Sequence, residues 1–279
     1  MGLIDQRQRV VFALSAKQTP ARSSTEYSRL ELYLQHLQEV RPYLLENVRC
    51  GVADSYYAKK TFVDGVLAMG LQLIGKLRID ANMRFLYGGL QKPRGRSRLY
   101  GDKVELTDLS GFEAAGMIDD EVQLFTKVVQ HVSLKLVIRI VVLVNLKDPD
   151  RPRLALLFSI DTTLSALEIV RRYSVRYQIE FLIRDAKQFT GLCDCQARSQ
   201  QAIGFHVNVS LAAVNIAKIN ARENHDGKKA FVFSLASMKH RAFNVQLLER
   251  FMDSFDLDPT LIKSHPGYRE LCAYGTIAA

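Results

Sequence analysis

Apolar and polar positions alternate with changing periods along the chain, and each period predicts a different kind of element. Near the N-terminus, two apolar runs around a polar turn predict a β-hairpin over residues 3–16. Helical spacing of apolar residues predicts helices through 27–37 and 62–69, while short apolar runs predict strands at 48–53 and 71–79. This order of two strands, helix, strand, helix and strand indicates a mixed α/β sheet covered by helices.

The middle of the chain has a different hydrophobic pattern, because none of its segments shows the spacing of a helix. A basic, glycine-containing loop around Lys92 opens this region. Strand-like runs then follow at 100–106, 125–132, 134–144 and 154–160. A turn rich in Asp and Pro at 147–152 joins the last two runs as a long hairpin. We therefore expect an all-β insertion between the two parts of the chain that contain helices.

Two spacings typical of a capping box mark the starts of predicted helices. Ser23-x-x-Glu26 precedes the first helix, and Ser165-x-x-Glu168 opens a helix predicted over 164–189. In this motif the serine hydroxyl accepts a hydrogen bond from a backbone N–H of the first turn. Both helices should therefore begin close to these serines.

The remaining segments are predicted to be helical. The run 202–219 is almost wholly apolar and predicts a buried helix, in which His206 is expected to be a satisfied core histidine rather than a metal ligand. An amphipathic pattern predicts a final helix over 238–255. We divide the chain into the first part of an α/β core (1–80), a β-rich insertion (81–160), a helix pair (161–222) and a C-terminal helical region (223–279).

The composition fits a chain with a sizeable core and a polyanionic partner. Its 279 residues are 48% hydrophobic and 24% charged, which excludes a chain that is disordered by composition. The formal net charge of +9 favours nucleic acid as a partner. No signal-peptide pattern opens the chain, and the longest apolar run, 134–144, is too short to span a bilayer. We expect a cytoplasmic protein without membrane association.

The predicted helix over 164–189 holds a stripe of candidate site residues. At about 100° per residue, Tyr173, Arg176, Glu180 and Lys187 fall within roughly a 60° sector, and Arg184 lies beside them. The spacing of four between an arginine and the glutamate on either side also fits a solvent-facing, salt-bridged helix. The stripe alone leaves both interpretations open.

The spacing Tyr173-x2-Arg176-x3-Glu180-x6-Lys187 resembles the Y-x2-R-x3-E-x6-K signature of bacterial insertion-sequence transposases of the DDE type. The sequence on both sides of it is also similar to that group. The resemblance implies an α/β (α+β) fold with a ribonuclease-H-like core and an all-β insertion before the helix that carries the catalytic glutamate. It also implies a DNA transposase that cleaves phosphodiester bonds and transfers strands at transposon ends.

The resemblance further implies which residues act in that chemistry. Asp54 and Glu180 would be the catalytic carboxylates and the ligands of Mg²⁺ or Mn²⁺, because hard divalent cations take carboxylate oxygens. Two such ions activate the attacking oxygen and stabilise the leaving oxygen. The DNA-contacting residues would be Tyr173, Arg176, Arg184 and Lys187. The implied partner is DNA that carries terminal inverted repeats, bound by a homodimer.

Asp54 has two interpretations. It follows the strand predicted at 48–53, where α/β proteins place their sites. It equally fits the N-cap of the next helix, because Asp is a preferred capping residue. The resemblance favours the metal role, since this group of transposases carries an Asp followed by an aromatic residue two or three positions later, as in Asp54-Ser55-Tyr56-Tyr57.

The start of the chain departs from the pattern of this group. The first catalytic Asp of these transposases lies on a strand upstream of a hairpin like 3–16, whereas Asp5 falls in the turn of the hairpin. We therefore expect an N-terminally truncated fragment whose sheet lacks its first strand and whose metal site lacks one of three carboxylates. The alternatives are a non-catalytic DNA-binding or regulatory protein derived from a transposase, and a stand-alone nuclease of other ancestry.

Overall fold

The computed structural model describes residues 1–91, 93–147, 153–223 and 232–276. Lys92 of the predicted basic loop and most of the predicted turn at 147–152 lie outside these ranges. The chain forms two compact units, which are described in turn. The sheet unit comprises Lys17–Tyr177, and the helical unit comprises Met1–Ala16 together with Gln178–Ala279.

The sheet unit contains one mixed sheet and the helices that cover it. Its strands are β3 (Cys50–Ala53), β4 (Gln72–Leu77), β5 (Met83–Leu86), β6 (Tyr100–Lys103), β7 (Glu113–Ile118), β8 (Val122–His131), β9 (Leu136–Asn145) and β10 (Arg153–Ser159). Its α-helices are α1 (Arg29–Val40), α2 (Lys60–Ala68) and α3 (Ala166–Ser174). Short 3-10 helices are η1 (Arg22–Ser24), η2 (Arg41–Tyr43), η3 (Ser55–Tyr57) and η4 (Val175–Tyr177).

The sheet joins the strands predicted for the core to those predicted for the insertion. Within the described residues, the strand order is β3-β4-β10-β9-β8-β5-β6, and β7 pairs with β8. The β3–β4 pair is parallel, as expected for two strands connected through a helix, and the other pairs are antiparallel. The all-β character predicted for the middle of the chain is confirmed from β5 to β10.

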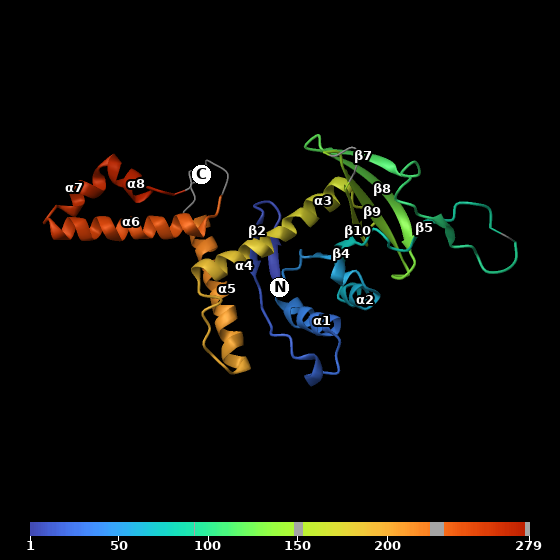
Figure 1. Ribbon diagram of the computed structural model, residues 1–279, viewed down its shortest axis with the longest axis horizontal. Helices are drawn as coiled ribbons and strands as arrows, with labels where there is room; N and C mark the ends of the chain where they lie inside the picture. Colours follow the sequence, from blue (N-terminus) through green and yellow to red (C-terminus); the bar gives the residue numbers. More distant parts are fainter. Residues whose placement is uncertain (92, 148–152, 224–231, 277–279) are drawn as a thin grey trace. The chain divides into compact units, whose positions relative to one another are not determined.

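Side chains that alternate along the strands give this sheet two apolar faces. On one face, Leu73 of β4 and Phe158 of β10 belong to a core that includes residues of α1 and α2. On the other face, Ile74 and Leu157 pack with Ile169 of α3. Figure 1 shows α1 and α2 on one side of β4 and α3 on the other. The predicted mixed sheet with helical cover is therefore confirmed.

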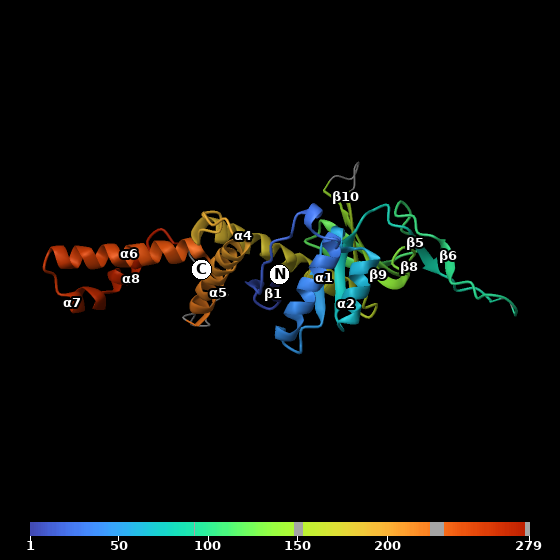
Figure 2. The same cartoon turned by 90° about the horizontal axis from the view of Figure 1, so that it is seen from below.

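The antiparallel β5–β6 hairpin carries a long basic loop. The described residues between the two strands, 87–91 and 93–99, reach away from the sheet, as Figure 2 shows. Arg94, Arg96 and Arg98 are exposed on this loop, and the Arg98 guanidinium lies 4.7 Å from the centroid of the Tyr87 ring. The described part of the loop therefore presents positive charge to solvent.

The start of α1 differs from the prediction. Ser28, not Ser23, is the N-cap, and its side chain accepts from the Glu31 N–H while the Glu31 carboxylate accepts from the Ser28 N–H. Ser23 instead lies in η1. The chain offers the same serine-to-glutamate spacing twice within ten residues, and only the second pair lies directly before the apolar positions that α1 buries, such as Leu30 and Leu34.

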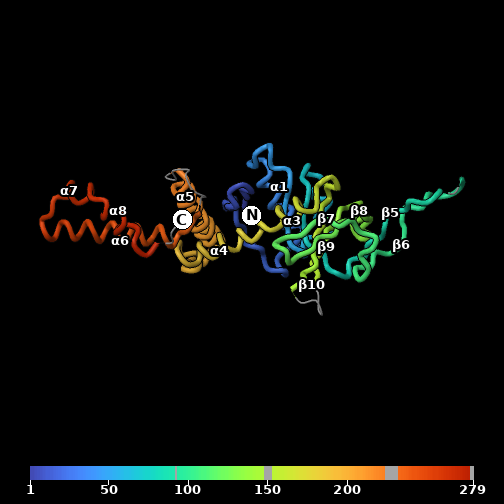
Figure 3. Tube along the Cα trace, turned by 90° about the horizontal axis from the view of Figure 1, so that it is seen from above, coloured from blue at the N-terminus to red at the C-terminus, as the bar shows by residue number. Residues whose placement is uncertain are grey.

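The helical unit contains a β-hairpin and the C-terminal helices. Its strands are β1 (Gly2–Asp5) and β2 (Val10–Ala13), and its helices are α4 (Gln178–Phe189), α5 (Gln200–Glu223), α6 (Leu235–Ser254), α7 (Pro259–Ser264) and α8 (Pro266–Cys272). Val11, Leu182, Ala186 and Val214 form its core. Helices α4 and α5 lie side by side, as Figure 3 shows.

The hairpin was predicted to belong to the main sheet, and this prediction is wrong. Strands β1 and β2 form a separate antiparallel two-stranded sheet. Side chains of α5 occupy the outer edge of β2, where another strand would pair. Asn215 accepts from the Ala13 N–H and donates to the Ala13 carbonyl, both at 2.8 Å. Asn208 bonds Ala16 in the same two ways, at 2.9 Å each.

Helix α5 was predicted to be buried, but one of its faces is exposed. Phe205 and Ile216 are 73% and 66% exposed, whereas Leu211 and Val214 are buried. Among the described residues, α5 is also the one helix that is long and apolar enough to cross a membrane. Its polar side chains bond the backbone of β2, as expected for a helix that packs within a folded unit, and no membrane span is indicated.

Candidate active site

Asp54 lies directly after β3, at the carboxyl end of the strand that pairs in parallel with β4. Its side chain is half-buried, and Oδ1 accepts a hydrogen bond of 2.9 Å from the Tyr56 N–H, which makes Asp54 the N-cap of η3. The cap interpretation of Asp54 is therefore confirmed, and its metal role stays a prediction. The cap fixes the carboxylate at the end of the strand and engages one of its two oxygens.

Aromatic rings surround the segment that follows Asp54. The Tyr57 ring centroid lies 4.8 Å from that of Phe62 and 5.6 Å from that of Tyr33. Burial raises the pKa of the Tyr57 hydroxyl to about 12, and the nearby Tyr33 and Asp54 contribute in the same direction. These contacts anchor η3 on α1 and α2 and so hold the position of the Asp54 carboxylate.

Tyr173 and Arg176 lie near Asp54 in the sheet unit. Burial raises the pKa of the Tyr173 hydroxyl, the Arg176 guanidinium opposes this, and the negative charge of Asp54 adds to the rise. The Arg176 guanidinium carbon lies 5.8 Å from the centroid of the Tyr173 ring and 5.1 Å from that of Tyr177. Asp54 thus lies close enough to Tyr173 for its charge to act on the Tyr173 hydroxyl, and Arg176 contacts the ring of the same tyrosine.

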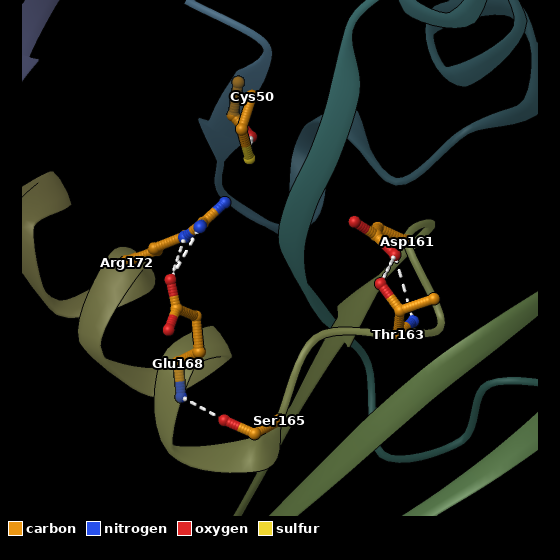
Figure 4. Close-up of polar contacts among 7 residues, drawn as sticks. Cys50, Asp161, Thr163, Ser165, Glu168 and Arg172 are labelled. Atoms are coloured by element: carbon orange, nitrogen blue, oxygen red, sulfur yellow. Dashed lines mark hydrogen bonds and ion pairs between the residues drawn. The ribbon is translucent and has the colours of Figure 1, made fainter.

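Helix α3 holds Tyr173 because its N-terminus and one face are fixed. The Ser165 hydroxyl accepts from the Glu168 N–H at 3.2 Å, so the predicted cap is confirmed. Ala166 and Ile169 are buried against the sheet. Figure 4 shows Glu168 turned toward Arg172, whose Nε and Nη2 donate to Oε1 at 2.9 and 2.6 Å.

Cys50 at the start of β3 lies close to Arg172. Burial raises the pKa of the Cys50 thiol, and the Arg172 guanidinium opposes that rise. The sequence prediction assigned no role to Arg172, although its spacing of four from Glu168 is the ordinary signal of a helical ion pair. Together Cys50, Arg172 and Glu168 link α3 to the strand that precedes Asp54 (Figure 4).

The predicted helix over 164–189 consists of two α-helices, α3 and α4, separated by the 3-10 helix η4. Two neighbouring residues explain the break. The Ser174 hydroxyl donates to the Arg171 carbonyl at 2.9 Å, a local bond that competes with the backbone bonds of a helix, and Val175 is β-branched. A 3-10 segment turns about 120° per residue, so the single helical wheel drawn over 173–187 does not describe this segment.

Glu180, Arg184 and Lys187 belong to α4 in the helical unit, and all three are exposed. Glu180 lies in the first turn of α4, where the helix dipole favours a negative charge. Leu182 and Ala186 anchor the opposite face of α4 in the core. The helix thus presents one carboxylate and two cations to solvent.

Arg184 pairs with a residue that the sequence prediction did not single out. Its Nη2 lies 3.2 Å from Oδ1 of Asp185, a buried carboxylate, and its guanidinium lies 4.8 Å from the centroid of the Phe181 ring. Asp185 also acts electrostatically on Lys218 of α5. Asp185 lies three residues after the apolar Leu182, so helical spacing places it on the buried face. An acidic residue at such a position is the sequence feature that could have identified it.

His206 of α5 matches its prediction as a satisfied histidine. Its Nε2 lies 2.8 Å from the Gly191 carbonyl oxygen, which joins α5 to the turn after α4. Gly191 has a positive φ of 71°, as the predicted end of the preceding helix requires. Both residues therefore serve the packing of the helical unit.

The candidate carboxylates match a divalent metal in the type of donor atom but not in the number of ligands. Carboxylate oxygens such as those of Asp54 and Glu180 are the donors that Mg²⁺ takes. Within the ranges that the structure describes, no group of three or more His, Cys, Asp or Glu residues gathers as a metal site. Asp54 and Glu180 therefore match the kind of donor but do not by themselves supply a full set of protein ligands.

The fold and these residues define a class. A mixed sheet with a parallel β3–β4 pair, an acidic residue at the end of β3 and a β-rich segment before a helix with a glutamate describe an α+β, ribonuclease-H-like domain. The family model of the transposase DDE domain matches residues 7–216, which is more than half of the chain. The chain belongs to this family, whose proteins act in DNA transposition and recombination and usually use a divalent metal. A search of curated proteins finds no match.

Proposed function

We propose that this protein is a DDE-type transposase of an insertion sequence, which cleaves phosphodiester bonds and transfers strands at transposon ends. The observation that carries the proposal is that Asp54, at the end of β3, lies close enough to Tyr173 for its charge to act on the Tyr173 hydroxyl, while Arg176 contacts the Tyr173 ring. A half-buried carboxylate near a phenol, which itself contacts a guanidinium, combines a metal donor with groups that bind phosphate.

In this proposal Asp54 and Glu180 are the carboxylates that hold Mg²⁺, or Mn²⁺ in its place. When bound, two such ions supply activation of the attacking oxygen and stabilisation of the leaving oxygen. Arg176 offers a planar, bidentate contact to a phosphate, and Lys187 acts as a point charge. Tyr173, whose ring Arg176 contacts, would contact the same DNA through its ring or its hydroxyl.

Further cations extend the proposed DNA contact beyond these residues. Arg184 is exposed on α4, and Arg94, Arg96 and Arg98 are exposed on the loop between β5 and β6. Phosphate contacts of this kind position a protein on DNA without reading its sequence. We propose terminal inverted repeats as the DNA partner, a homodimer as the acting form and the nucleoid in the cytoplasm as the place of action.

The test is DNA cleavage by the purified chain with Mg²⁺ or Mn²⁺, on a labelled duplex that carries the inverted repeats flanking its own gene. Asp54→Asn keeps an amide oxygen that caps η3, so it separates the metal role from the cap role. We expect Asp54→Asn and Glu180→Gln each to lower the cleavage rate about a hundredfold or more, because a metal ligand is lost. Glu249→Gln, which loses only a surface pair with Lys263, is the matched control.

Full cleavage by Asp54→Asn would assign Asp54 to the cap alone and would refute the proposed metal site. Equal losses in Glu249→Gln would show that the assay reports charge rather than chemistry. Far-UV circular dichroism and thermal unfolding of each variant check that the fold is retained.

A second candidate function is a non-catalytic DNA-binding or regulatory protein derived from a transposase. The observation that favours it is the exposed basic loop between β5 and β6, whose Arg94, Arg96 and Arg98 can contact phosphate without a metal. This candidate predicts repeat-specific binding that is unchanged by Asp54→Asn and no cleavage by the unaltered chain. A salt series separates such binding from the electrostatic background, which is independent of sequence.

A further inference from the structure

Side chains join the two sides of the loop between β5 and β6 at its base. The Gln91 side chain accepts from the Arg98 N–H and donates to the Arg98 carbonyl, both at 2.9 Å. The Arg98 guanidinium is engaged in the same place, because it donates to the Tyr100 carbonyl at 2.9 Å and lies over the Tyr87 ring. The loop therefore has a stem of its own, and Arg98 belongs to that stem.

The tip of the loop carries two arginines on either side of a single glycine. Arg94, Gly95 and Arg96 are exposed, and no described residue forms a hydrogen bond or an ion pair with either guanidinium. Gly95 has a φ of 99°, and nothing but its chain neighbours lies within 4 Å of the position that a Cβ would take. The two guanidinium groups are therefore available to a partner, and the backbone between them has no side chain to keep that partner at a distance.

The charge of this segment selects a polyanion. Between residues 81 and 101 the sequence contains five Lys or Arg residues and no Asp or Glu. Both cations at the described tip are arginines, and a guanidinium is less strongly hydrated than an ammonium, so it gives up water more readily in a confined site. The tip therefore suits a narrow, negatively charged groove better than an open row of phosphates.

Shape decides which groove of DNA such a tip can enter. The major groove is about 12 Å wide and admits a helix or a two-stranded ribbon, whereas the minor groove is about 6 Å wide. The tip holds neither of those elements, since the chain bends at residues 93–96, outside β5 and β6. Its other side chains are compact, and Figure 2 shows the loop reaching away from the sheet, so the sheet does not obstruct its approach.

We propose that Arg94 and Arg96 insert into the minor groove of A·T-rich DNA. Tracts of A·T pairs have a narrow minor groove whose enhanced negative potential attracts arginine. The loop thus reads the width of the groove, in addition to the phosphate contacts proposed above. This inference rests on the proposed function only in taking DNA as the partner.

The test is binding of the full chain to short labelled duplexes, measured by fluorescence anisotropy in EDTA so that no cleavage contributes. One duplex has a central A·T tract, and the second has G·C pairs at the same positions. We expect the A·T duplex to bind about tenfold more tightly, because G·C pairs place an amino group in the minor groove. A third duplex with inosine·cytosine pairs lacks that amino group but keeps the major-groove edge of G·C, and it should bind more tightly than the G·C duplex.

Two double variants locate the preference. Arg94→Lys combined with Arg96→Lys keeps the charge and should remove the preference for A·T, while affinity for the G·C duplex stays within about twofold. Arg22→Lys combined with Arg29→Lys changes two exposed arginines of the same unit outside the loop, and it should keep the preference. Circular dichroism checks that both proteins are folded.

Equal affinity of the unaltered chain for the A·T and G·C duplexes would overturn the proposal. So would an inosine duplex that binds like the G·C duplex, an absence of binding to all three, or a preference that the lysine variant of the loop keeps. The cleavage assay described above separates this result from the proposed function. Cleavage of the repeats without an A·T preference refutes the loop inference alone, and an A·T preference without cleavage refutes the catalytic function alone.

Discussion

The outer edge of β2 offers a quantitative test of how side chains replace a missing strand. Asn215 accepts from the Ala13 N–H and donates to the Ala13 carbonyl, both at 2.8 Å and partly buried. Asn215→Leu removes both bonds and leaves both backbone groups without this partner. Leaving a buried polar group unsatisfied costs about 1–3 kcal/mol, so two partly buried groups cost about 2–4 kcal/mol.

The new leucine offsets part of that loss. Full burial of a leucine contributes about 1.5–3 kcal/mol, and position 215 is half-buried, so roughly 1 kcal/mol is regained. The hydrogen-bond loss therefore outweighs the apolar gain, and we expect the free energy of unfolding to fall by about 1–3 kcal/mol. Urea unfolding followed by far-UV circular dichroism measures this difference.

Two comparisons sharpen the experiment. Gln188→Leu adds a leucine at an exposed position of α4 and should change the free energy of unfolding by less than about 0.5 kcal/mol. Asn215→Asp keeps the acceptor for the Ala13 N–H but sets a carboxylate oxygen against the Ala13 carbonyl, so it should also destabilise the unit at neutral pH. An Asn215→Leu protein as stable as the Gln188→Leu protein would refute the edge argument.

Three further predictions follow from buried and exposed groups. Burial lowers the pKa of Lys218 from 10.5 to about 8. Between these two pH values the unfolded chain binds the proton of Lys218 and the folded chain does not. The free energy of unfolding should therefore rise by about 3 kcal/mol between pH 8 and 10.5. Lys218→Met should remove that rise in pH-dependent urea titrations, and an unchanged slope would contradict it. Gly75→Ala places a Cβ 2.6 Å from the buried ring of Phe158 and should cost about 1–3 kcal/mol in the same assay, whereas a neutral effect would show that the ring moves freely. Arg94→Ala combined with Arg96→Ala should lower the slope of log affinity against log salt for duplex DNA by about 1.8, and an unchanged slope would exclude the loop from phosphate contact.

Features set by neighbouring residues were predictable from the sequence. The Ser165 cap and the helix end at Gly191 depend on hydrogen bonds and backbone angles within a few residues, and both are confirmed. The position of Asp54 at the end of β3 follows from the apolar run before it. The order of strands and helices indicated a mixed sheet for the same reason, since the periods of the sequence report local burial.

Features set by distant partners were missed. Strands β5 and β7 were not predicted, because β5 has only four residues and β7 is mostly exposed. The break between α3 and α4 was readable in principle from Ser174 and Val175, but the resemblance to a continuous signature helix favoured one element. The role of Asp185 required knowledge of Lys218, which lies on another helix.

Helix α5 shows most clearly why an apolar run is ambiguous. All five polar residues between 202 and 219 (His206, Asn208, Ser210, Asn215 and Lys218) are half-buried or buried, while all six exposed residues are apolar. This is the reverse of an ordinary amphipathic helix, whose polar side faces water. The inward polar side is satisfied because the open edge of β2 offers backbone donors and acceptors to Asn208, Asn215 and Lys218. The polar and apolar sides of α5 thus lie opposite to the usual arrangement, so an apolar run alone could not predict which side of this helix packs on the hairpin.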